Sequence, residues 1–339
     1  MGHQMSTRPI RAALVAAATA ALLAGAALPA AAAGAHPCYP ALLTGHGDTL
    51  VPEGATWDPL HGRFLVGSLR HGTVQSVAPD GSTRTLVDDP DLVTVVGLHV
   101  DAARGRVLLA DADTGGSVRS TPGTTYRRAW VGAYDLTTGR RLFHVDLAAV
   151  AADGGPHVAN DLAFGPDGTA YVTDSMAPVV YRVGVDGSAS VLVRDDRLAS
   201  PAGTFGLNGI VCEGDTLVVG HYQGGTLWRI PLSRPSAVEQ IRVAGADGRL
   251  VGLDGLLARP DGAVLGVTNA VGGTGHDAEV ELRSSDGWHT ARLTSVRPSA
   301  DIAPTALTPG PDGRVYQLSG RVDLAVQGTL LDEFTLRRV

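Results

Sequence analysis

The sequence predicts an all-β fold, a six-bladed β-propeller, from three observations. First, glycine and proline are frequent, with 44 and 20 of 339 residues, and they separate short apolar runs, which is typical of many short strands joined by tight turns. Second, no amphipathic helix is recognisable beyond the N-terminus. Third, a strand–turn–strand–loop–strand unit recurs six times, and repeats of about 40–50 residues are typical of propeller blades.

The repeat is clearest at residues 160–187, NDLAFGPDGTAYVTDSMAPVVYRVGVDG, and the segment 208–230 aligns with it. The six units begin near residues 53, 96, 160, 208, 254 and 305, at spacings of 43, 64, 48, 46 and 51 residues. A pair of β-sandwiches does not explain six aligned units, whereas blades stacked in a ring bury the apolar faces of every sheet. We expect residues 41–51 or the C-terminal EFTLRRV to supply the strand that closes the ring.

Residues 1–33 are predicted to be a cleaved signal peptide. Arg8 and Arg11 form a basic start, Ala12–Leu28 is almost wholly apolar, and Ala31 to Ala33 offer small residues for cleavage. A membrane anchor is the alternative, but the run is short and alanine-rich for a spanning helix. The mature chain would then be secreted, with an N-terminal segment at 34–49 and a single propeller domain at 50–339.

The charge and cysteine content exclude several classes of function. The net charge of −7 becomes −9 once the two arginines of residues 1–33 are removed, so nucleic acid and anionic membranes are poor partners. All 27 basic residues are arginine, which excludes a Schiff-base lysine. Cys38 and Cys212 either pair as a disulfide or leave Cys212 as a buried free thiol, and their spacing gives no zinc-thiolate motif. We expect a monomer.

One aligned position carries a carboxylate or an amide in four of the six units. These residues are Glu53, Asn160, Asn208 and Asp254, and the other two units have Val96 and Thr305 there. The position starts the first strand, which lines the central channel of a propeller, so the four side chains would converge. Their oxygen atoms suit Ca²⁺ best, with Mg²⁺, Mn²⁺ or Zn²⁺ as alternatives. The alternative is that these side chains only hydrate the channel or form hydrogen bonds to strand ends.

A second aligned position lies at the end of the second strand. Its residues are Ser68, Asp111, Asp174, His221, and Thr268 with Asn269. Asp174, His221 and Asn269, together with Asn160, are candidates for substrate contact, although such residues equally stabilise turns. Most other histidines are expected at the surface, with His71 and His157 in loops that border the channel mouth.

The order and spacing of these motifs resemble the regucalcin/gluconolactonase family. The motifs are PEG-x-x-W-D at Pro52–Asp58, ND at 160–161, NG at 208–209 and DG at 254–255, and the resemblance covers roughly Leu50–Tyr316. It implies a six-bladed calcium-type propeller, a cation held by Glu53, Asn208 and Asp254, and a general base at Asp254. It also implies that Asn160 completes the metal shell or contacts substrate.

The insertion Thr114–Trp130 departs from that pattern. It is either a lid that brings Arg119, Arg127 or Arg128 to an acidic substrate, or a plain solvent loop.

Two functions remain after this reading. The first is an exported metal-dependent lactonase or ester hydrolase acting on a small lactone or ester. The absence of a G-x-S-x-G motif disfavours a serine nucleophile on an α/β-hydrolase scaffold. The second is a non-catalytic propeller that binds a ligand or protein and holds a structural Ca²⁺. A haem enzyme has little support because the sequence has no C-x-x-C-H motif.

Overall fold

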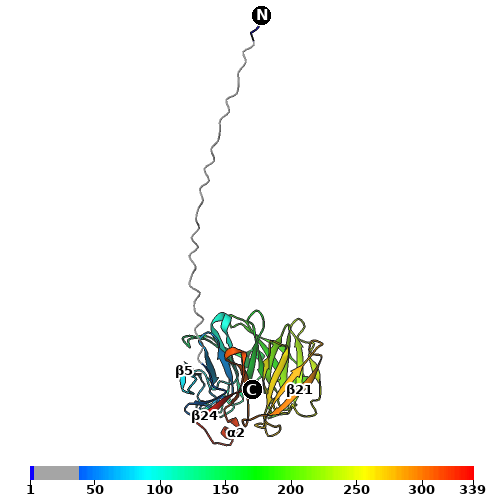
Figure 1. Cartoon of the computed structure of the whole chain (residues 1–339). Coiled ribbons are helices and arrows are strands. Elements are labelled where there is room, and N and C mark those ends of the chain that lie inside the picture. Colours follow the sequence, from blue (N-terminus) through cyan, green and yellow to red (C-terminus); the bar gives the residue numbers. More distant parts are fainter. Residues whose placement is uncertain (4–37) are drawn as a thin grey trace. The chain divides into compact units, whose positions relative to one another are not determined.

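The computed structural model describes residues 1–3 and 38–339, and residues 38–339 form one compact unit (Figure 1). The predicted signal peptide falls almost entirely outside the described residues. Among the residues that are described, no helix is long and apolar enough to cross a bilayer. The compact unit is all-β, as predicted, with two short helices, α1 (Leu147–Ala151) and α2 (Val322–Ala325), and three single 3-10 turns.

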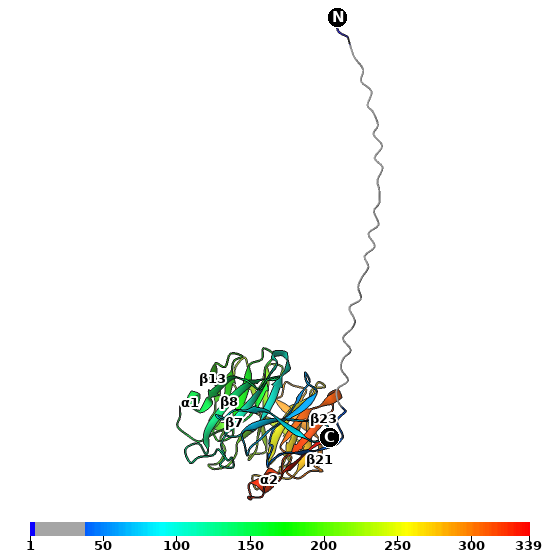
Figure 2. The ribbon, with the colours of Figure 1, turned by 90° about the vertical axis from the view of Figure 1, so that its left-hand side faces the viewer.

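The strands of the described chain form two four-stranded and two eight-stranded sheets. Each eight-stranded sheet consists of two antiparallel halves joined by one parallel pair, β8 with β10 and β17 with β21. The strands therefore group into six antiparallel units of four. Figures 1 and 2 show the sheets in two views related by a 90° turn.

The first three units follow each other along the chain. They are β2 (Ala55–Asp58), β3 (Arg63–Gly67), β4 (Thr73–Val77) and β5 (Thr83–Asp88); β6 (Leu98–Asp101), β7 (Arg106–Ala112), β8 (Arg127–Asp135) and β9 (Arg141–Asp146); and β10 (His157–Phe164), β11 (Ala170–Asp174), β12 (Val179–Val183) and β13 (Ala189–Arg194).

The last three units complete the set. They are β14 (Leu207–Glu213), β15 (Thr216–His221), β16 (Thr226–Pro231) and β17 (Glu239–Ala244); β18 (Leu253–Ala258), β19 (Ala263–Thr268), β20 (Ala278–Arg283) and β21 (Thr290–Pro298); and β22 (Ala306–Pro309), β23 (Val315–Ser319) and β24 (Glu333–Arg338) with β1 (Leu42–His46).

The first strands of the six units make a closed series of contacts. β2 contacts β6, β6 contacts β10, and the series continues through β14, β18 and β22 back to β2. The last unit is completed by β1, which pairs antiparallel with β24. Both segments expected to close the ring therefore do so together, and the predicted N-terminal segment at 34–49 contributes a strand to the sheet.

Pro-Asp-Gly and Asp-Gly sequences form tight turns between the strands. The side chains of Asp80, Asp167 and Asp186 each accept a hydrogen bond from the backbone N–H two residues on. The glycine after each aspartate has a positive φ, between 83° and 86°, which a residue with a Cβ adopts only at a cost. The Asp-Gly residues that predicted short strands are therefore the residues that form the turns between them.

The hydrophobic core lies between neighbouring units. The first and last units share an aromatic cluster in which Tyr39, Trp57 and Tyr316 surround Phe64 with ring centroids 4.9–5.0 Å apart. The other interfaces are filled mainly by valine, leucine and alanine. Burial of both faces of each sheet makes the inner strands a rigid support for the side chains at their ends.

Candidate functional site

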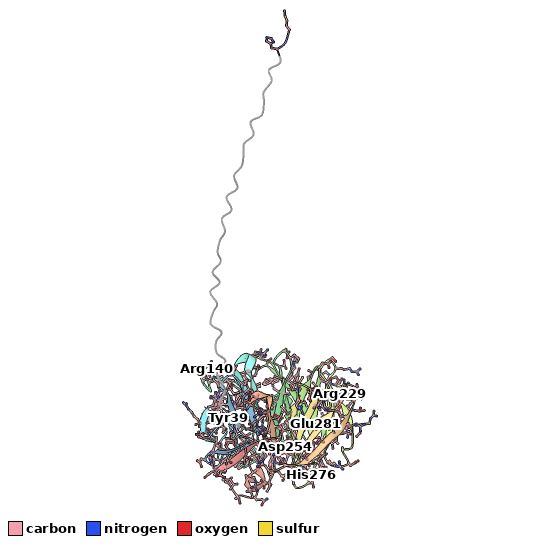
Figure 3. All side chains as sticks on the ribbon, viewed as in Figure 1. Tyr39, Arg140, Arg229, Asp254, His276 and Glu281 are labelled. Carbon is pink, nitrogen blue, oxygen red and sulfur yellow. The ribbon has the colours of Figure 1, made fainter. Side chains whose placement is uncertain are left out.

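The four aligned residues Glu53, Asn160, Asn208 and Asp254 line one cavity at the centre of the ring of first strands. Asp254 is buried and lies near the middle of the compact unit in the view of Figure 3, whereas Arg140 and Arg229 lie toward its outline. The cavity has a volume of about 20 Å³. That is room for about one water molecule or ion. A substrate would have to sit at the mouth above the cavity.

β-Bulges present these side chains to the cavity. The pairing of β10 with β11 skips from Ala159 to Leu162, so Asn160 leaves the ladder. The same irregularity occurs around Asn208 in β14 and around Asp254 in β18. A bulge redirects the side chain of an unpaired residue and is common beside functional sites. Three bulges at the same place in three units explain how amides and a carboxylate enter otherwise apolar strands.

The glycine that follows most of these residues lets the inner strands approach closely. A Cβ on Gly209 would lie 2.3 Å from the carbonyl oxygen of Asp254, and one on Gly255 would lie 2.6 Å from that of Thr305. The freed backbone groups bond across units, since Gly255 N–H donates to Thr305 O at 2.9 Å. Likewise, the Thr305 hydroxyl donates to the carbonyl oxygen of Glu53 at 2.7 Å. In the Glu-Gly, Asn-Gly and Asp-Gly pairs, the glycine thus allows the inner strands to pack closely, and the polar side chain before it faces the cavity.

The cavity concentrates negative charge. Burial, with the charge of Asp161 added, raises the pKa of Asp254 to about 7, although the hydrogen bond from Asn269 and the nearby Asn208 amide partly offset the rise. Burial and the charges of Asp254 and Asp161 also raise the pKa of Glu53 well above its usual range, even though part of Glu53 is open to the channel. Both shifts express the cost of holding carboxylates together without a cation.

Asp254 uses only one of its two oxygens within the protein. Its Oδ2 accepts a 2.6 Å hydrogen bond from Asn269 Nδ2. Its Oδ1 is buried without a hydrogen-bond partner, because the Asn208 amide does not reach it in hydrogen-bond geometry. A buried carboxylate oxygen without a partner is costly. This atom, beside a second carboxylate and two amides in an ion-sized cavity, fits a hard divalent cation.

Two further residues at the cavity escaped the sequence analysis. Asp161 follows Asn160, and its Oδ1 lies 2.8 Å from Nε2 of His99, which also lines the cavity. His99 is therefore not the surface residue that was expected. One signal was available: the other three polar residues of the column precede a glycine, and only Asn160 precedes a charged residue.

The structure separates the candidates for substrate contact. Asn160 lines the cavity, and Asn269 bonds Asp254. The carboxylate of Asp174 accepts hydrogen bonds from three backbone N–H groups and from Tyr181, and it also bonds His157. Burial lowers the pKa of His221, whose Nδ1 accepts a hydrogen bond from Gly224 N–H. Neither Asp174 nor His221 lines the cavity, and each accepts hydrogen bonds from nearby backbone N–H groups. Substrate contact by either residue stays a prediction.

Other polar residues of the second column also stabilise turns and strand ends. Ser68 Oγ donates to Leu50 O, and Thr268 Oγ1 donates to His276 O. Asp111 accepts hydrogen bonds from Arg128 and lies 3.1 Å from His144. This is the role that the sequence analysis held open as the alternative.

His157 differs from the expectation of a loop residue at the mouth. It is 2% exposed, lies in β10, and bridges Asp174 and Asp153 at 2.7 and 2.8 Å. Burial alone would lower its pKa, but the two carboxylates outweigh burial and the net pKa is raised.

The insertion at 114–130 is a loop that runs into β8 at Arg127, and it also contacts the first unit, where Ser117 and Val118 bond the carbonyl oxygen of Arg70. Ser120, Thr124 and Thr125 all donate to the buried carboxylate of Asp113. Arg119 donates to the carbonyl oxygens of Asp89 and Leu92. Arg128 is likewise committed, to Asp111, whereas Arg127 is exposed. Both cysteines are free, with Cys38 exposed and Cys212 half-buried.

Comparisons with known proteins show the fold. No family model and no curated protein matches the sequence. The structure of the major allergen Mala s 1 of Malassezia sympodialis matches 89% of this chain and 96% of its own, with a TM-score of 0.71 and 16% identity.

Two further solved structures are informative. A gluconolactonase of Xanthomonas campestris matches 88% of this chain and 89% of its own, with a TM-score of 0.58 and 18% identity. A calcium-binding regucalcin of Agrobacterium tumefaciens matches 87% of this chain and 94% of its own, with a TM-score of 0.58 and 18% identity.

At such identities the likeness concerns the fold. The resemblance to regucalcin and gluconolactonase proteins, predicted from four short motifs, is thereby confirmed as a likeness of propeller fold. Within residues 1–3 and 38–339, no group of three or more His, Cys, Asp or Glu side chains is arranged to hold a metal. The set described here has two carboxylates, and its other members are amides.

Proposed function

We propose that this chain is an exported, divalent-metal-dependent hydrolase, a lactonase, built on a six-bladed propeller. The single observation that carries the proposal is the unpartnered, buried Oδ1 of Asp254 in a cavity shared with Glu53, Asn160 and Asn208. The blade count is supported by six antiparallel four-stranded units whose first strands contact in a closed series. Export is supported by the signal-peptide pattern of residues 1–33.

Glu53, Asn160, Asn208 and Asp254 would hold the cation, with Ca²⁺ the best fit to their oxygen atoms. When bound, a divalent cation supplies a Lewis acid for the lactone carbonyl. The carboxylates hold the cation by charge, and the amides add neutral oxygens that avoid further repulsion. The bulges of β10, β14 and β18 keep the side chains of Asn160, Asn208 and Asp254 in place before anything binds.

The chemistry proposed for Asp254 is that of a general base. Its Oδ1 would accept a proton from water as the water oxygen attacks the lactone carbonyl carbon. The ring C–O bond then breaks, and the proton passes to the departing ring oxygen, which leaves a hydroxy acid. The neighbouring structures of gluconolactonase and regucalcin proteins support the same reaction class.

A second candidate function is a binding propeller with a structural Ca²⁺. The observation that favours it is the small cavity, which has room for an ion and leaves the substrate site to the surface around the mouth. The fold is compatible with both functions. The number of coordination positions left open by the protein separates them.

Acid release from a panel of lactones, followed in a pH-stat, tests the proposal. Native protein, Asp254→Ala and the control Val96→Ala are each assayed with excess Ca²⁺ and with chelator. The proposal predicts hydrolysis that needs both Ca²⁺ and Asp254 and that survives in Val96→Ala. No acid release by folded native protein with excess Ca²⁺ would favour the binding propeller instead.

A further inference from the structure

Asn269 stands behind Asp254 rather than in the cavity. It follows β19, is fully buried, and donates from Nδ2 to Asp254 Oδ2 at 2.6 Å and to the carbonyl oxygen of Pro304 at 2.9 Å. Its Oδ1 accepts hydrogen bonds from the Tyr222 hydroxyl and from Val271 N–H. Every polar atom of this amide therefore has a partner.

The direction of these hydrogen bonds follows from chemistry alone. Gly272 N–H can only donate, and it donates to the Tyr222 oxygen at 2.8 Å. The single proton of Tyr222 is then left for Asn269 Oδ1, and burial raises the pKa of Tyr222, so the hydroxyl keeps that proton. A flipped amide would place Oδ1 against two acceptors, Asp254 Oδ2 and the Pro304 carbonyl. The Asn269 amide thus has one orientation.

The packing around this relay is close. Tyr222 is 4% exposed, and a Cβ on Gly272 would lie 2.5 Å from its ring. The loop after Asn269 is therefore held against the tyrosine by a residue that has no side chain. Asp254 receives one hydrogen bond from a group that cannot rotate away, and its other oxygen, Oδ1, is left for the cavity.

We propose that Asn269 and Tyr222 are positioning residues that hold the Asp254 carboxylate in one rotamer, with Oδ2 occupied and Oδ1 presented to the cation and to water. This inference rests on the proposed function, because the pair acts through Asp254 and touches neither substrate nor metal. It replaces the expectation that Asn269 contacts substrate. Partners of this kind orient metal ligands, and their loss typically lowers metal affinity about 10–100-fold.

Calorimetric titration with Ca²⁺ alone tests the inference on native protein, Asn269→Ala, Tyr222→Phe and Tyr134→Phe. The last is a matched control, because Tyr134, like Tyr222, is a buried tyrosine whose hydroxyl donates a hydrogen bond. Its acceptor is the carboxylate of Asp89, away from the cavity. We expect the Kd for Ca²⁺ to rise about 10–100-fold in Asn269→Ala, to rise less in Tyr222→Phe, and to stay unchanged in Tyr134→Phe.

The stoichiometry separates positioning from mere stability. A purely structural role would lower the melting temperature and the fraction of molecules that bind Ca²⁺, while the remaining fraction kept the native Kd. If Asn269→Ala does not fold, Tyr222→Phe carries the same test. With saturating Ca²⁺, lactone hydrolysis by either variant should lose kcat with little change in KM.

Two failures are distinguishable. Native protein that binds Ca²⁺, with an unchanged Kd in both Asn269→Ala and Tyr222→Phe, overturns the inference and leaves the proposed function standing. Native protein that binds no Ca²⁺ overturns the proposed function, and the inference falls with it.

Discussion

The charge in the cavity makes the metal-free protein sensitive to pH in an unusual direction. The pKa of Asp254 is raised to about 7, against about 4 in an unfolded chain. The folded state therefore binds an extra proton between these values, and its stability falls as pH rises from about 4 to about 7. Three pKa units correspond to at most about 4 kcal/mol, since each unit is worth about 1.4 kcal/mol.

Asp254→Asn removes this charge without changing the size of the side chain. Without metal, the variant should be more stable than native protein by up to about 4 kcal/mol at pH 8, and by only about 1.4 kcal/mol at pH 5, one unit above the unfolded pKa. Urea denaturation in the presence of a chelator measures both differences. Excess Ca²⁺ should stabilise native protein at pH 8 and the variant much less. The exposed Asp312→Asn is the control and should show no such pH dependence.

The refuting result is clear. A native-minus-variant difference in the free energy of unfolding that is the same at pH 5 and pH 8 would mean that Asp254 carries no strained charge. A variant less stable than native protein at pH 8 without metal would mean the same. Either result removes the reason to expect a cation in this cavity.

Three other changes test the support of the site. Gly209→Ala should cost about 1–3 kcal/mol of stability, because its Cβ meets the Asp254 carbonyl, whereas Gly116→Ala, in open space, should stay within about 0.5 kcal/mol in the same urea assay. Because the pKa of His157 is raised in the folded state, its protonated ring stabilises the fold below about pH 6.5, and this stabilisation is lost as pH rises through the folded pKa. The free energy of unfolding of His157→Gln should therefore fall less than that of native protein as pH rises above about 6.5. Arg119→Ala should cost about 1–3 kcal/mol and leave the KM for acidic lactones unchanged, since Arg119 holds the carbonyl oxygens of Asp89 and Leu92; a raised KM would restore the lid hypothesis.

The fold could be predicted from the sequence because the residues that form the turns repeat at regular intervals. Asp-Gly turns and a polar residue before a glycine or an aspartate recur in the same order, so an alignment of the units places Glu53, Asn160, Asn208 and Asp254 in one column. The column converges because each member lies in or just before a first strand, and the first strands contact in a ring. These relations depend on local sequence and on repetition, both of which a single chain displays.

Contacts between units were beyond the reach of the sequence. Asp161 meets His99 only because a bulge in β10 changes which side chains face the cavity. Asn269 meets Tyr222 through a loop whose path depends on Gly272. Asp174 and His221 end their strands as Thr268 does, one residue before Asn269, and neighbouring donors and burial give them structural contacts. Strand position alone does not tell which partner a polar side chain finds.

The most direct test of the account is a crystal structure of the protein grown with Ca²⁺. The account predicts one cation in the cavity, with oxygens of Glu53, Asn160, Asn208 and Asp254 at about 2.3–2.6 Å and at least one position left to water. Asp254 should bind through Oδ1, with Oδ2 still bonded to Asn269. A cavity without a cation at saturating Ca²⁺, or a cation bound elsewhere, would contradict the central claim.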